Sequence, residues 1–164
     1  MWFITRPPES RTRIFSIAKP ALKTRPCFYL FLNFFLWPGS QAVATRQDYS
    51  YAVKPGTFAG ATTVAAKSGE IIILWATGFG PTTPSAPSGV SVPGNGSYPT
   101  ATSPTVTIGN TAAIVYDSAL APGSAGLYQI AIQVPNTLAD GERPIQAGIG
   151  GALSPTGVVL SVAD

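Results

Sequence analysis

Residues 71–84 read IIILWATGFGPTTP, an apolar run of strand length that breaks into a loop of glycine, proline and threonine. Isoleucine and other β-branched residues favour strands, whereas glycine and proline favour turns. The same alternation of short apolar runs and turn residues recurs in residues 104–116, 126–135 and 144–161. This pattern is typical of an all-β chain.

The composition supports one all-β domain with an N-terminal extension. The chain has 164 residues, and 45% of them are hydrophobic, which is enough for a substantial core. Only 10% are charged, while glycine and proline number 17 and 16. Leu, Glu and Lys, which usually fill exposed helix faces, are scarce after residue 50, so we expect little helix there.

Seven or eight short strands are expected, packed as a β-sandwich. Residues 71–75 are apolar on both faces, which predicts a central, covered strand with Trp75 in the core. Gly109 and Asn110 separate two apolar runs and predict a tight hairpin with a positive φ. Alternation assigns one side of residues 127–134 to the core, namely Tyr128, Ile130, Ile132 and Val134. The expected strands are 49–53, 71–75, 90–92, 105–108, 112–116, 127–134, 145–149 and 158–162.

Residues 1–44 differ in kind from the rest of the chain. Basic residues precede the apolar stretch 27–37, and the small residues of 38–44 follow it. This is the order of a secretory signal, with cleavage expected before Thr45 or, as a second choice, after Ala42. We therefore expect residues 1–44 to lie outside the core and residues 45–164 to form the domain.

Two other interpretations of this segment stay open. It is a degenerate or misplaced start, because Asn33 interrupts the apolar run and the basic region is long. Alternatively, residues 27–37 form an uncleaved membrane anchor, although its eleven residues fall short of the roughly twenty that a spanning helix needs.

Charge and residue content exclude several function classes. Residues 1–45 hold six cations and one carboxylate, a net charge of +5, whereas residues 46–164 hold four cations and six carboxylates, a net charge of −2. Four scattered cations do not make a nucleic-acid groove, so no nucleic acid is expected as a partner. Cys27 is the only cysteine and histidine is absent, which excludes a Cys/His metal site and a Ser-His-Asp triad. No cofactor is expected.

The ordered set of motifs resembles the immunoglobulin-like IPT/TIG domains. It is more similar still to a C-terminal domain of unknown function found in many large secreted bacterial proteins. The matching segments are residues 69–82, the hairpin at 106–110, residues 120–135 and the closing residues 149–154. The resemblance implies an immunoglobulin-like β-sandwich in an exported protein, with no known activity or cofactor.

Four tyrosines are candidates for special roles. Tyr128 follows a Pro-Gly corner at the start of a strand, which is typical of a tyrosine corner whose hydroxyl bonds upstream backbone. Tyr49 and Tyr51 share one face of their expected strand, and Tyr98 lies in the irregular stretch 81–104. These three are candidates for a ligand or partner surface.

We expect a non-catalytic structural or interaction module, secreted or at the cell surface. Its partners would be neighbouring modules or a cell-surface or extracellular protein, and a membrane only if residues 27–37 are an anchor. The alternative is a carbohydrate- or surface-ligand-binding module that uses residues 81–104 and exposed tyrosines. An enzyme would need at least two of the internal carboxylates in one cleft and with perturbed pKa values. These carboxylates are Asp48, Glu70, Asp117, Asp140 and Glu142.

Overall fold

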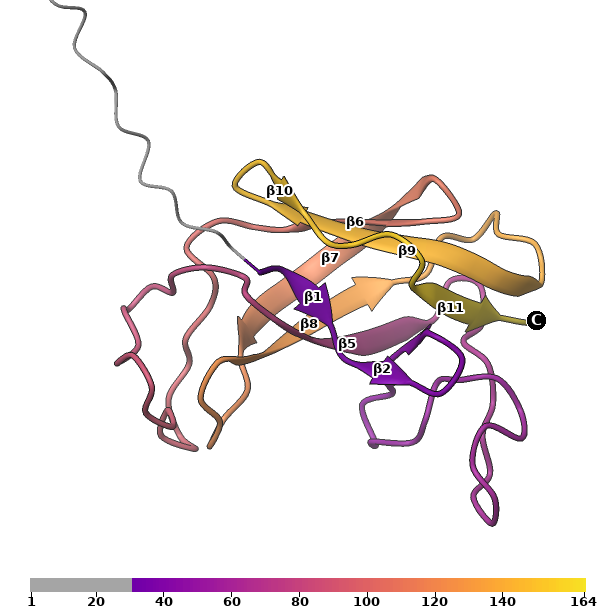
Figure 1. The fold of residues 1–164 in the computed structure, drawn as a ribbon, viewed down its shortest axis with the longest axis horizontal. Coiled ribbons are helices and arrows are strands. Elements are labelled where there is room, and N and C mark those ends of the chain that lie inside the picture. Colours follow the sequence, from indigo (N-terminus) through magenta and orange to yellow (C-terminus); the bar gives the residue numbers. More distant parts are fainter. Residues whose placement is uncertain (1–30) are drawn as a thin grey trace, which may run out of the picture.

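The computed structural model describes residues 31–164, and these contain strands but no helix (Figure 1). The all-β prediction is therefore confirmed. Five strands have only two residues: β1 (Asn33–Phe34), β2 (Leu36–Trp37), β3 (Gln41–Ala42), β4 (Ala44–Thr45) and β10 (Ala152–Leu153). The six longer strands are β5 (Ile71–Thr77), β6 (Thr105–Ile108), β7 (Thr111–Leu120), β8 (Leu127–Gln133), β9 (Gly141–Ile149) and β11 (Val159–Val162).

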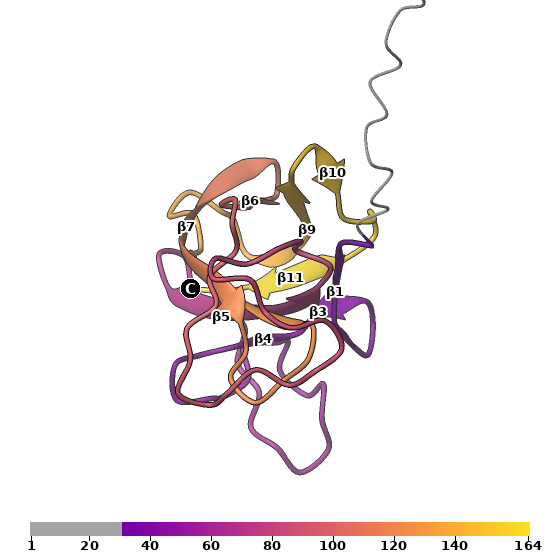
Figure 2. The same cartoon turned by 90° about the vertical axis from the view of Figure 1, so that its left-hand side faces the viewer.

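The strands form one continuous, strongly curved sheet. Its order is β1-β5-β8-β7-β6-β9-β11-β3-β2, with β4 also on β5 and β10 on β9. β7 pairs with β6 through its first residues and with β8 through its later ones, so it belongs to two parts of the sheet. β9 likewise pairs with β11 and then with β6. Seen from the end, the strands surround a central core (Figure 2).

Residues 41–45 join the two ends of this sheet. Gln41 in β3 pairs in parallel with Val159 of β11, and Ala44 in β4 pairs antiparallel with Leu74 of β5. Between them, the carbonyl of Val43 accepts a hydrogen bond of 3.0 Å from the N–H of Trp75. One short segment thus nearly closes the sheet into a barrel-like shell.

Period-two alternation fills the core. Ile72, Leu74 and Ala76 on β5 point inward and are fully buried, as are Ile130 and Ile132 on β8. The predicted core side of residues 127–134 is confirmed. Each fully buried aliphatic side chain contributes about 1.5–3 kcal/mol relative to exposure.

The prediction that residues 1–44 lie outside the core is wrong for residues 32–44. Leu32 and Phe34 are 2% and 4% exposed, whereas the neighbouring Phe35 is 46% exposed. This is the alternation of a strand, and Phe34 pairs with Ala76 of β5. Ala42 and Ala44 are also buried. The rest of the expected leader, residues 1–30, lies outside the described residues, and among residues 31–164 no helix could span a membrane.

Three further expectations need correction. Residues 49–53 form only isolated bridges, through Tyr51 and Ala52, and residues 90–92 form no strand. β5 is central, but its outward face is covered only in part: Ile71 is exposed, and Ile73 and Trp75 are half-buried. Trp75 is on this outward side, where its indole N–H donates a 2.9 Å hydrogen bond to Oγ1 of Thr45. An indole whose N–H has a hydrogen-bond partner and whose ring is half-buried does not need full burial in the core.

The hairpin predicted at Gly109 and Asn110 is confirmed. The two residues connect β6 to β7 and have φ values of 57° and 66°. A two-residue type I′ turn needs positive φ at both positions, and glycine and asparagine tolerate this best.

Phe34 and Phe35 provide a direct test of the N-terminal correction. We expect Phe34→Ala to lower the free energy of unfolding by about 3–5 kcal/mol, because a buried ring leaves a cavity. Phe35→Ala should cost about 1 kcal/mol or less, since its ring is half in solvent. Urea denaturation followed by circular dichroism measures both. Equal, small effects would show that this segment is not part of the core.

Candidate interaction surfaces

The outward side of β5, β8 and β7 is a partly exposed sheet surface, which we term the open face. The register places Ile71, Gln133 and Ile114 side by side across the three strands. Ile114 is 57% exposed, and Ile71 is exposed as well. Asp117 is the only charged residue in these strands. The open face consists of Ile71, Ile73, Trp75, Gln129, Ala131, Gln133, Ile114, Tyr116, Asp117 and Ala119.

A β-bulge adds an aromatic ring to the open face. The pairing of β7 with β8 shifts between Val115 and Asp117, so Tyr116 and Asp117 are both exposed. An extra residue on one strand produces this change of side. The hydroxyl of Tyr116 donates a 3.1 Å hydrogen bond to Oε1 of Gln133 and thereby links β7 to β8 across the surface.

A second surface, an aromatic cluster of Trp37, Tyr51 and Phe58, lies beside β2. The ring centroids are 4.9–5.7 Å apart and the ring planes meet at 63–81°. Edge-to-face packing of this kind uses the ring faces within the cluster. A platform that stacks on a sugar needs an open ring face. The cluster therefore serves to fasten residues 51–58 to the sheet.

Arg46 fastens the same region through charge. Its Nε lies 2.6 Å from Oε1 of Glu70, and its terminal nitrogens donate to the carbonyls of Tyr51 at 2.8 Å and Ala65 at 3.0 Å. Arginine can hold several acceptors at once because its donors form a rigid planar fork. The loop between β4 and β5 is thus tied to the start of β5.

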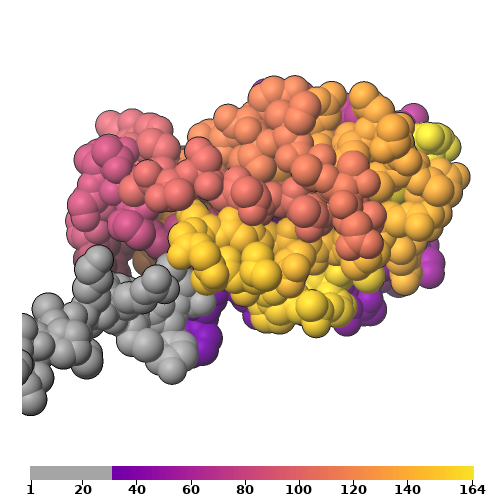
Figure 3. Space-filling model, turned by 90° about the horizontal axis from the view of Figure 1, so that it is seen from above, coloured from indigo at the N-terminus to yellow at the C-terminus, as the bar shows by residue number. Residues whose placement is uncertain are grey.

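The structure does not bring the three candidate tyrosines into one surface. Tyr49 is exposed in the turn after β4, where its φ is 63°, and hydrogen bonds from Ser50 lower the pKa of the neighbouring Asp48. Tyr51 belongs to the aromatic cluster. Tyr98 packs partly buried against the core, and its carbonyl accepts from the N–H of Leu120. The stretch 81–104 that contains Tyr98 projects from one end of the molecule (Figures 1 and 3).

Tyr128 bonds the backbone upstream of its strand. It is 7% exposed, and its hydroxyl donates a hydrogen bond to the carbonyl of Gly80, in the loop after β5. Its ring lies 5.8 Å from that of the buried Phe79. Burial raises the pKa of the Tyr128 hydroxyl. The bond crosses from β8 to a loop 48 residues earlier, a longer connection than the few residues of a tyrosine corner.

The same loop borders a hollow of about 340 Å³. Tyr128 and Leu120 form part of its wall, and the rest comes mainly from residues 80–89. The hydroxyl of Thr82 donates to the carbonyl of Pro84 and accepts from the N–H of Ala86. The hydroxyl of Thr82 is therefore bonded within the loop, both as donor and as acceptor. No charged side chain lines the hollow.

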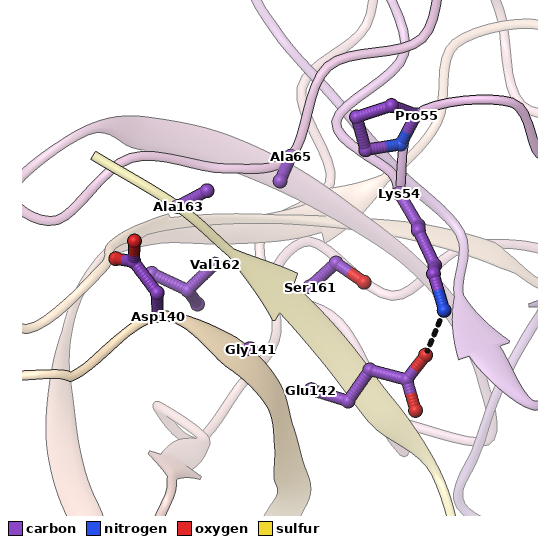
Figure 4. A pocket seen from close by; sticks show the side chains of 9 residues that line it. All are labelled: Lys54, Pro55, Ala65, Asp140, Gly141, Glu142, Ser161, Val162 and Ala163. Carbon is purple, nitrogen blue, oxygen red and sulfur yellow. Dashed lines mark hydrogen bonds and ion pairs between the residues drawn. The ribbon is translucent and has the colours of Figure 1, made fainter.

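Asp140 and Glu142 border another hollow, of about 450 Å³ (Figure 4). Glu142 is bound to Lys54, with Nζ 3.2 Å from Oε1, and its carboxylate points away from that of Asp140. Asp140 instead accepts a 3.3 Å hydrogen bond from the N–H of Asp164. Among residues 31–164, no three metal-ligating side chains come together. These interactions join the start of β9 to the loop between β4 and β5 and to Asp164 after β11.

The fold and these surfaces define an all-β domain with a nearly closed sheet. No protein-family model, curated protein or solved structure matches the chain. The resemblance to IPT/TIG domains therefore stays a hypothesis.

Tyr128→Phe tests the bond to the loop after β5. We expect a loss of about 1–2 kcal/mol in the free energy of unfolding, because the carbonyl of Gly80 loses its donor. Tyr116→Phe is the matched control, since it removes an exposed hydroxyl and should change stability by no more than about 0.5 kcal/mol. Urea denaturation at neutral pH measures both. Equal losses would contradict a special role for Tyr128.

The raised pKa of Tyr128 predicts a dependence on alkaline pH. The folded chain holds the hydroxyl proton more tightly than the unfolded chain, whose tyrosines titrate near pH 10. The contribution of the protonated Tyr128 hydroxyl to the free energy of unfolding is complete below about pH 10. It is lost as the pH rises toward the pKa of this hydroxyl in the folded chain. The wild-type chain should therefore lose more stability than Tyr128→Phe between about pH 9 and pH 11. Urea denaturation at each pH measures the free energy of unfolding of both chains. Equal changes of this free energy with pH in the two chains would contradict the prediction.

Proposed function

We propose that this chain is a non-catalytic structural or interaction module, an immunoglobulin-like sandwich of the IPT/TIG type that works outside the cytoplasm. It docks through the open face on a neighbouring module or on a cell-surface protein. The open face is the observation that carries the proposal.

The composition of the open face supports docking. An antiparallel sheet with one solvated side usually presents polar residues there. Here the outward positions include Ile71, Ile73, Trp75, Ile114 and Tyr116, with Asp117 as the single charge. Protein interfaces are enriched in aromatic residues and depleted of charge at their centre. Burial of such side chains against a partner would release about 25 cal/mol per Å² of apolar surface.

The carbohydrate-binding alternative has less support. It needs ring faces that are open and close together, whereas the rings of the aromatic cluster pack edge to face. The hollow beside residues 80–89 has mixed polar and apolar walls without an exposed aromatic platform, and the hydroxyl of Thr82 is already bonded within the loop. The proposal of a non-catalytic role is supported by the ion pairs that occupy Glu70 and Glu142.

Export is part of the proposal and rests on the basic and apolar N-terminal residues. Cleavage before Thr45 would remove β1 to β3, Ala44 of β4, and the buried Leu32 and Phe34. An exported chain with this fold is therefore processed upstream of Leu32, if it is processed at all.

Hydroxyl-radical footprinting on intact cells of the native host tests docking and location together. In the purified chain, Ile114 and Tyr116 should be oxidised, because both are exposed. On cells they should be protected several-fold, while Leu153 on β10, 67% exposed and outside the open face, keeps its labelling. The labelled residues are read by mass spectrometry.

Two outcomes would overturn different parts of the proposal. Equal oxidation of Ile114 in the purified chain and on cells would contradict docking through the open face. Loss of labelling at Leu153 as well would contradict an accessible position at the cell surface. Ile114→Lys serves as the matched variant, and we expect it to restore oxidation of Tyr116 on cells without a change in circular dichroism.

A further inference from the structure

The N-terminal segment and the C-terminal strand lie side by side and run in the same direction. β3 pairs in parallel with β11, and the N–H of Val159 donates a 3.0 Å hydrogen bond to the carbonyl of Ser40. The hydroxyl of Ser161 donates a 2.8 Å bond to Oε1 of Gln41, and both side chains are buried. Ser40 and Gln41 are thus joined to β11 by backbone and side-chain bonds.

A second set of bonds joins the same segment to β5. The N–H of Phe35 donates to the carbonyl of Trp75, and the N–H of Trp75 donates to the carbonyl of Val43, each at 3.0 Å. The N–H of Val43 in turn donates to the carbonyl of Phe35 at 2.7 Å. These three residues form a closed loop of hydrogen bonds, which we term the interlock.

The direction of the segment decides how it responds to tension. β1 runs antiparallel to β5 and begins at Asn33, opposite Thr77 at the end of β5. By contrast, Ile114 lies level with Ile71 at the start of β5. A pull on the chain before β1, with the open face held, therefore acts along the strands. The interlock is then loaded in shear, and the β3–β11 bonds are loaded behind it, through the β2–β3 pair. In an antiparallel pair pulled from one end, the bonds would instead open one after another.

We infer that the domain is a load-bearing module that resists tension applied through its N-terminal chain. The inference rests on the proposed function, because it takes the docked open face as the fixed point. The load passes from residues 33–45 to β5 and β11, and from β5 to the partner on the open face.

Single-molecule force spectroscopy on the full chain tests this inference. With Cys27 replaced by serine, one handle is attached at the N-terminus and the other at Ile114→Cys on the open face. The comparison chain carries its handles at Asp140→Cys and Asp164→Cys. These positions flank the pair of Gly141 with Val162, so this pull opens the β9–β11 ladder from one end. We expect a higher rupture force for the first geometry at the same loading rate.

Two buried serines provide matched variants. Ser161→Ala removes the bond to Gln41 within the load path, whereas Ser154→Ala removes a bond to the N–H of Ala147, outside that path. At constant force in the first geometry, Ser161→Ala should unfold about fivefold faster, the factor for loss of one ordinary hydrogen bond. Ser154→Ala should unfold at the wild-type rate. In the wild-type chain the Ser154–Ala147 bond is still intact when the interlock and the β3–β11 bonds break, so its loss does not change the barrier. Urea denaturation shows that both variants are folded.

Equal rupture forces in the two geometries would overturn the inference, as would equal acceleration by the two serine variants. Neither result depends on a partner. Protection of Ile114 on cells together with a low rupture force would leave docking in place and remove load bearing alone. A high rupture force without protection of Ile114 on cells would contradict the proposed function. The resistance of the interlock and the β3–β11 bonds to shear would then be a property of the domain alone.

Discussion

The closure of the sheet by residues 41–45 is the constraint on which the rest of the structure depends. Gln41 occupies the edge of β11, and Ala44 occupies the edge of β5. Open edges expose unpaired N–H and C=O groups and invite pairing with other chains. The same few residues also place Leu32 and Phe34 over the core. The same segment therefore both pairs with the two sheet edges and covers the core.

Closure also divides the outer surface into two unlike parts. On the β2–β3 side, the loop between β4 and β5 lies over the sheet, held by the aromatic cluster and by the bonds of Arg46. On the β5–β8–β7 side, Ile71, Ile114 and Tyr116 stay exposed. The long loop between β4 and β5 thus lies on the β2–β3 side, and the β5–β8–β7 side forms the open face.

Local pattern was enough to predict the elements that depend only on alternation and turn chemistry, such as β8 and the hairpin at Gly109 and Asn110. It could not predict β1 to β4. An apolar run such as residues 31–37 looks the same in a signal segment and in a strand, and only pairing with Ala76 of β5 distinguishes them. The prediction that Trp75 lies in the core was wrong for a related reason. Alternation separates the two faces of a strand but does not tell which face is buried. The bulge at Tyr116 was equally hidden, because one extra residue reverses the side of those after it.

Trp75 is where closure and the open face meet. Its backbone belongs to the interlock with Phe35 and Val43, and its side chain lies on the open face, bonded to Thr45 of β4. A partner that packs on the half-buried indole would exclude the remaining water from the Trp75–Thr45 bond, which strengthens a hydrogen bond. Docking would then stabilise the attachment of the N-terminal segment to β5. By reciprocity, a firmly closed sheet would hold the indole ready for the partner.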